Sequence, residues 1–177
     1  MMSLLYRITL ALISTSWMVV VYGIKSEWNC LFGNQIVTSL VLLCIPIALS
    51  IISLGLLRWF KYCNDQITAS RSIVLADDEF LPVYLGYFFM ALSIPSIYTL
   101  IFVYCIVFVF TFLTQAQYFN PIFLLLGYHY YHVETLRGTR VFVISRGKVI
   151  RSVDEIDFQM LRRLNDTTYI AIKERTL

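Results

Sequence analysis

Residues 80–133 read FLPVYLGYFFMALSIPSIYTLIFVYCIVFVFTFLTQAQYFNPIFLLLGYHYYHV, a run without a single Asp, Glu, Lys or Arg. The surface of a soluble domain carries charged side chains that interact with water, and so long an uncharged run leaves no place for them. Two shorter apolar runs precede it, at residues 8–24 and 36–57. Because about 20 apolar residues cross the bilayer core as a helix, the sequence predicts a polytopic membrane protein.

The composition agrees with this class and limits the function. Hydrophobic residues make up 59% of the 177 residues and charged residues 14%, against roughly 45–50% and 25% in soluble domains. A large catalytic domain does not fit beside a membrane bundle in a chain of this length. The cysteines Cys30, Cys44, Cys63 and Cys105 show no pairing pattern, so we interpret them as free thiols.

The basic residues predict the number of membrane crossings, because Lys and Arg near the ends of spans favour the cytoplasm. Arg7 precedes the first apolar run, and Arg58, Lys61 and Arg71 follow the second. The tail after residue 133 holds nine more Lys and Arg. If the N-terminus and this tail are both cytoplasmic, the number of spans is even. We therefore expect residues 80–133 to cross twice, with an outer turn before Pro95, since proline disfavours helix at the preceding residue.

The predicted fold is an α-helical integral membrane bundle of four transmembrane helices with a small cytosolic α+β tail rich in β-hairpins. The spans are expected at residues 4–24, 36–57, 80–94 and 97–117. They form a transmembrane domain at residues 1–120, followed by the cytosolic tail at residues 121–177. The alternative is one long tilted span after residue 80, which would place the basic tail on the outer face.

The tail is expected to be mainly β-structure. Its aromatic and β-branched residues predict strands at residues 122–135, 140–145 and 148–153, with a hairpin turn at residues 136–139. A last strand is predicted at residues 167–172. A unit of about 55 residues is marginal alone, so we expect it to pack on its own copies, on the membrane helices or on a partner.

A helix is predicted between the last two strands of the tail. Asp154 is typical of a helix N-terminus, and Arg162 and Arg163 would lie in its last turn. Its apolar face would consist of Ile156, Met160 and Leu164.

No catalytic, cofactor-binding or metal-binding residue is predicted. The only histidines, His129 and His132, would point to opposite faces of a strand and could not share a metal ion. The acidic run Asp77-Asp78-Glu79 suits the positive end of the helix that follows it. A paired-carboxylate active site there is the disfavoured alternative.

Polar side chains within the spans leave two interpretations open. They are Ser14, Thr15, Ser16, Ser50, Ser53, Gln115 and Gln117. Such side chains bond neighbouring helices and allow close packing, or they line a pore in an oligomer. We favour packing.

The basic residues of the tail are the candidate partner-binding residues. They are Arg137, Arg140, Arg146, Lys148, Arg151, Arg162 and Arg163. Nine basic and six acidic residues from position 134 onward leave a net charge of only +3. This mixture suits protein contacts better than direct nucleic-acid binding, although basic residues beside a membrane also attract anionic lipid.

Two stretches, YFNPIFLLLGYHYYHVETLRGTRVFVISRGKVIR at residues 118–151 and FQMLRRLNDTTYIAI at residues 158–172, resemble the KwaA family, the membrane subunits of the Kiwa anti-phage defence system. The resemblance implies a bacterial inner-membrane protein with four spans, cytoplasmic termini and homo-tetrameric assembly. It further implies a soluble DNA-binding effector, KwaB, as partner. The pair would sense phage at the envelope and block its DNA replication and transcription.

The leading functional hypothesis is a non-enzymatic membrane sensor or scaffold, without a cofactor, that presents its tail to a cytosolic effector. The first alternative is an oligomeric pore-forming or membrane-permeabilising abortive-infection effector. The second is an accessory subunit of a transporter or membrane enzyme.

Overall fold

The computed structural model describes residues 2–28, 33–56, 67, 70–114, 120–153, 158, 161–165 and 167–171. The chain forms two compact units. The first consists of Met1–Gly55 and Glu79–Asn120, and the second of Leu56–Asp78 and Pro121–Leu177.

The first unit is a bundle of four helices, at the positions that the apolar runs predict. They are α1 (Met2–Lys25), α2 (Gln35–Leu56), α3 (Phe80–Ser93) and α4 (Ile97–Thr114). Among the described residues α1, α2 and α4 are long and apolar enough to cross a membrane, whereas α3 is apolar but shorter. At 1.5 Å per residue, the 14 residues of α3 span about 21 Å of a hydrocarbon core that is about 30 Å thick. Three long apolar helices indicate membrane association, and the fourth span stays a prediction.

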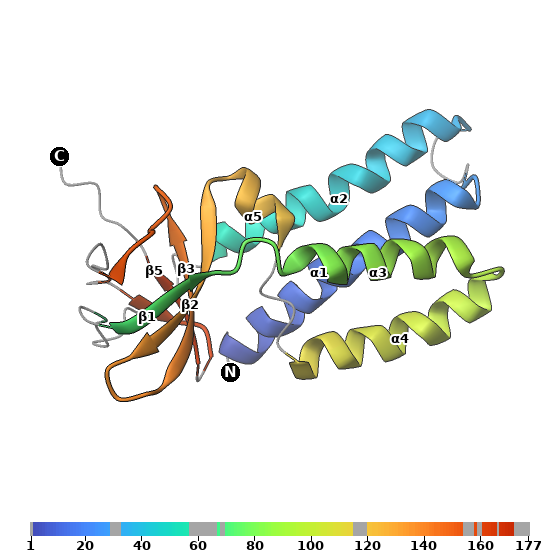
Figure 1. Ribbon diagram of the computed structural model, residues 1–177. Helices are drawn as coiled ribbons and strands as arrows, with labels where there is room; N and C mark the ends of the chain where they lie inside the picture. Colours follow the sequence, from blue (N-terminus) through green and yellow to red (C-terminus); the bar gives the residue numbers. More distant parts are fainter. Residues whose placement is uncertain are drawn as a thin grey trace. The chain divides into compact units, whose positions relative to one another are not determined.

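The turn between α3 and α4 is confirmed at Pro95. α3 ends at Ser93, and the Ile94 backbone N–H donates to the Met90 carbonyl at 3.1 Å. Ser96 then caps α4, because its Oγ accepts a 3.3 Å hydrogen bond from the Thr99 backbone N–H. α3 and α4 therefore run in opposite directions as a hairpin (Figure 1).

α1 packs against both helices of this hairpin. The buried apolar cluster between them consists of Met18, Tyr22, Tyr84, Tyr87, Ala91, Ile94 and Leu100. By contrast, large apolar side chains such as Ile36 on α2, Phe89 on α3 and Phe102 on α4 are exposed. Exposed apolar surface on this scale is typical of helices that face lipid.

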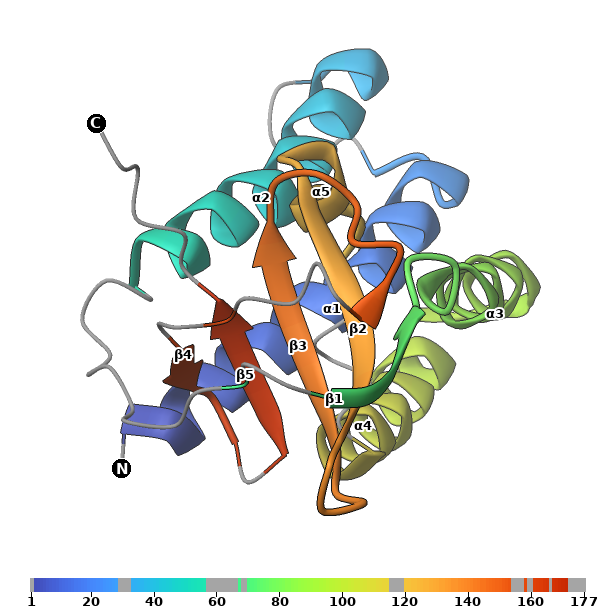
Figure 2. The same ribbon diagram turned by 60° about the vertical axis from the view of Figure 1, so that its left-hand side comes forward.

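The second unit is built around a mixed five-stranded sheet with the order β1-β2-β3-β5-β4 (Figure 2). Its strands are β1 (Ser70–Leu75), β2 (Tyr128–Thr135), β3 (Arg140–Arg146), β4 (Leu161–Arg163) and β5 (Thr168–Ala171). β3 and β5 are parallel, and the other neighbours are antiparallel. One face covers a core of Ile67, Tyr131, Val133, Val141, Val143, Phe158, Leu161 and Ala171.

The strand predicted at residues 122–135 is wrong in its first part. Residues Pro121–Leu125 form the short helix α5, and β2 begins only at Tyr128. Proline suits the first position of a helix, because its missing N–H would be unpaired there. Gly127 then adopts φ +78°, a conformation that glycine reaches without strain and that ends the helix.

Two further predictions for the tail are wrong. No strand forms at residues 148–153. The end of the predicted helix is β4, which pairs antiparallel with β5, while Asp154, Ile156 and Met160 lie outside the described residues. The Leu164 N–H donates to the Thr168 carbonyl at 2.9 Å, so this tight connection and strand pairing override the helical spacing of the sequence. The strands predicted at residues 140–145 and 167–172 are confirmed as β3 and β5.

Candidate functional site

The β2–β3 hairpin brings two of the predicted basic residues to one end of the sheet. Arg140 begins β3, opposite Glu134 on β2, and Arg137 is exposed in the turn between the two strands. β1 adds Arg71, because Ser72 pairs with Glu134 from the other side. Its position after the second apolar run predicted only a loop at Arg71, not a strand.

Three other candidates lie at or beyond the opposite end of this hairpin. Arg146 pairs with Tyr128, the first residue of β2, and its guanidinium carbon lies 5.6 Å from the centre of the Tyr128 ring. Lys148 and Arg151 are exposed in the segment that follows β3. The predicted basic surface is therefore divided between the two ends of the hairpin.

Arg162 and Arg163 lie on β4, with different environments. Arg162 is only 7% exposed, so it does not belong to an exposed basic surface. Arg163 is exposed, and its Nε donates a 3.2 Å hydrogen bond to the backbone carbonyl of Asn165. Along β4 the side chains of Leu161 and Arg162 are buried, and only Arg163, the last residue of the strand, is exposed.

The two histidines are confirmed on one strand, β2, and have different partners. His129 Nδ1 lies 2.6 Å from Asp77 Oδ2, and the ring of His132 lies 5.3 Å from that of Phe142. Asp77 also accepts a 2.7 Å hydrogen bond from the Tyr130 backbone N–H through Oδ1. Through these two contacts the Asp77 carboxylate joins the segment after β1 to the start of β2. The pairing was not predicted, since no local spacing links residues so far apart in sequence.

No metal site emerges from the described part of the chain, where no three His, Cys, Asp or Glu side chains are placed to share an ion. Cys44 and Cys105 are free and exposed. Cys30 and Cys63 lie outside the described residues.

The hydroxyl groups of the helical unit bond mainly within it. Thr15 Oγ1 donates to the Ala11 carbonyl at 2.8 Å, and Ser50 Oγ donates to the Pro46 carbonyl at 2.7 Å. Between elements, the hydroxyls of Tyr87 and Thr111 lie 2.8 Å apart. Such bonds join helices where no water competes. Gln115 and Gln117 lie outside the described residues.

Two cations are accommodated at the ends of α1. The guanidinium carbon of Arg7 lies 5.0 Å from the centre of the Phe112 ring on α4, a geometry that favours a cation over the ring face. Lys25 Nζ donates a 2.7 Å hydrogen bond to the Ile94 carbonyl in the α3–α4 turn. Both charges therefore lie at helix ends, where long basic side chains reach the interface of a bilayer.

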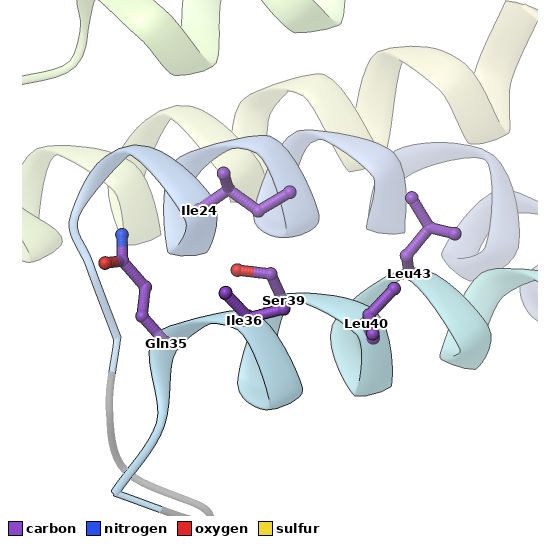
Figure 3. A pocket seen from close by; sticks show the side chains of 6 residues that line it. All are labelled: Ile24, Gln35, Ile36, Ser39, Leu40 and Leu43. Carbon is purple, nitrogen blue, oxygen red and sulfur yellow. The ribbon is translucent and has the colours of Figure 1, made fainter.

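An apolar groove of about 440 Å³ lies between the end of α1 and the start of α2. Figure 3 shows Ile24 facing it from α1 and the other lining residues on α2. The lining residues are Ile24, Gln35, Ile36, Ser39, Leu40 and Leu43. Aliphatic side chains dominate the lining, so it suits an apolar chain and offers no group for acid–base chemistry.

Comparison with known proteins identifies one family. A family model described as "Anti-phage protein KwaA" matches residues 6–170. No curated protein and no solved structure matches the chain. The match covers both units, so it extends the resemblance seen in the tail to the helices.

Proposed function

We propose that this chain, which belongs to the KwaA family of anti-phage proteins, acts in phage defence as a non-enzymatic membrane sensor or scaffold. Its four helices cross the bacterial inner membrane and place both termini in the cytoplasm. Its sheet unit recruits a soluble DNA-binding effector of the KwaB kind. Three long apolar helices and the α3–α4 hairpin support this topology.

The separation of charge between the two units carries the proposal. α2, α3 and α4 contain no charged residue, whereas exposed arginines gather on the sheet unit at both ends of the β2–β3 hairpin. Apolar helices of this kind suit anchoring, and a charged, folded sheet suits contact with a soluble protein.

The bonding of the buried hydroxyl groups supports a scaffold over a pore. Ser50 Oγ accepts a 2.9 Å hydrogen bond from Asn120 Nδ2, and the hydroxyl oxygens of Thr15 and Tyr104 lie 3.1 Å apart. A water-filled pore needs polar groups that face its lumen, and these groups are instead engaged inside one chain. The exposed faces of the helices carry mainly apolar side chains.

Co-purification tests the proposal. The full chain, tagged and extracted in mild detergent, is co-expressed with a soluble DNA-binding effector of the KwaB kind, which we expect in the adjacent reading frame. We expect stoichiometric capture of that protein and reduced plaque counts only when both proteins are present. The matched control is the soluble protein with an unrelated tagged membrane protein.

Measurement of ion flux distinguishes the proposed scaffold from the alternative of a pore. If expression of the chain alone depolarises cells and protects them without a soluble partner, the scaffold function is refuted and the pore takes its place. Capture and protection that require the partner, without depolarisation by the chain alone, support the scaffold.

A further inference from the structure

Three neighbouring strands place two arginines around one glutamate at the turn end of the β2–β3 hairpin. Glu134 Oε1 lies 4.0 Å from an Arg71 guanidinium nitrogen, and Oε2 lies 3.9 Å from Arg140 Nε. The arginine side chains are 76% and 85% exposed, whereas that of Glu134 is 24% exposed. The carboxylate is therefore mostly buried between two guanidinium groups, and the arginine side chains themselves are largely exposed to solvent.

The turn that follows adds a third arginine and an apolar side chain. Leu136 is 70% exposed, and Arg137 beside it is also exposed. The turn is well fixed: the Thr135 N–H donates to the Thr139 carbonyl at 2.9 Å, and the Gly138 N–H to the Thr135 carbonyl at 2.9 Å. Gly138 has φ +78°, which glycine adopts without strain. We call Arg71, Glu134, Leu136, Arg137 and Arg140 the hairpin patch.

We infer that the hairpin patch binds an acidic segment of a soluble protein, with Leu136 as the apolar contact at its centre. The inference rests on the proposed function and specifies the surface and the chemistry of the partner. Three arginines and one glutamate leave a net charge of +2, which attracts an acidic surface and raises the rate of association. An ordered turn also reduces the entropy lost on binding.

The makeup of the patch favours protein carboxylates over phosphates. Glu134 would repel a phosphate group, while Arg71 and Arg140 already share a carboxylate and have further donors for a second one. A nucleic acid needs a longer basic track along its backbone. The exposed Leu136 gives a phosphate or a lipid headgroup nothing to bind, whereas protein interfaces combine an apolar centre with arginines, which are enriched there.

Charge reversal tests the patch in the full chain. Arg140→Glu and Arg71→Glu should each reduce capture of the neighbouring soluble protein by at least about tenfold and weaken its dependence on salt. Lys148→Glu makes the same change at an exposed residue beyond the other end of the hairpin and should retain capture. Arg140→Gln removes the charge without placing two carboxylates together, so it should show a smaller loss in the same direction.

Photo-crosslinking identifies what the patch touches. Benzoylphenylalanine in place of the exposed Leu136 should crosslink to the soluble partner through peptides rich in Asp and Glu, and the same group in place of Lys148 should not. Crosslinks from position 136 to phospholipid or nucleic acid would overturn the inference, as would unchanged capture by the Arg140→Glu and Arg71→Glu variants.

If the wild-type chain captures no soluble protein, the proposed function fails and the inference with it. Normal wild-type capture with unaffected variants refutes the patch alone.

Discussion

Replacing Asp77 with alanine should loosen the sheet unit around the start of β2. Its carboxylate accepts hydrogen bonds from the Tyr130 backbone N–H at 2.7 Å and from His129 Nδ1 at 2.6 Å. An ionised carboxylate only accepts, so the histidine donates through Nδ1. Both side chains are mostly buried, at 22% and 21% exposed, and solvent screens their interaction little.

The expected cost follows from what the substitution leaves behind. Tyr130 is 0% exposed, so its N–H would lose its carboxylate acceptor, at about 1–3 kcal/mol for an unsatisfied buried donor. Loss of the charged hydrogen bond to His129 adds about 1.5–3 kcal/mol. Because the two effects share one carboxylate and are not additive, we expect about 2–4 kcal/mol in total. Asp77→Asn keeps an acceptor for the Tyr130 N–H and should cost less.

Hydrogen–deuterium exchange of the full chain in detergent measures this loss. At 1.4 kcal/mol per factor of ten, Asp77→Ala should speed amide exchange in peptides covering β2 by on the order of 30-fold or more. The matched control is Asp78→Ala, an exposed neighbouring carboxylate, which should stay within about 0.5 kcal/mol of wild type. Equal rates of amide exchange in the two variants would refute the idea that the hydrogen bonds of Asp77 stabilise the start of β2.

The remaining predictions concern the helical unit. A reporter active only in the periplasm should be silent after Leu177 and active after Trp28, and a signal from the Leu177 fusion would mean an odd number of spans. Thr111→Val removes a hydroxyl 2.8 Å from that of Tyr87 and should lower the free energy of unfolding in detergent by about 0.6 kcal/mol. In a Tyr87→Phe background the same substitution should leave the free energy of unfolding unchanged. Mass measurement in mild detergent should find a symmetric homo-oligomer, and an active monomer would contradict it.

The helices could be predicted from the sequence because their signal is local. An uninterrupted apolar run needs no knowledge of distant residues, and α1, α2, α3 and α4 begin and end within a few residues of the runs that predicted them. The turn at Pro95 was equally local. Whether α3 crosses the bilayer depends on thickness and tilt rather than on sequence pattern, which is why the structure leaves it a prediction.

The sheet was harder to predict because a strand depends on the partner it pairs with as well as on its own residues. β1 is a short segment, Ser70–Leu75, within what looked like a loop, and it becomes a strand by pairing with β2. Only the β-branched pair Ile73-Val74 before an acidic run could have indicated it. Conversely, the residues of β4 fit a helical spacing, and their pairing with β5 decides the outcome.

The construction of the sheet from two chain segments limits how far anchoring and partner binding can be separated. β1 precedes α3 in the chain, whereas β2 to β5 follow α4. A chain that ends at residue 120 would keep β1 and lose the other four strands of the sheet. A chain that begins at residue 121 would expose the edge of β2 to which β1 pairs. An unpaired edge of this kind invites aggregation. Loss of function on deleting the tail would therefore report on the folding of the whole sheet. Single substitutions of Arg71, Leu136 or Arg140 change exposed side chains of the hairpin patch and so report on the binding surface.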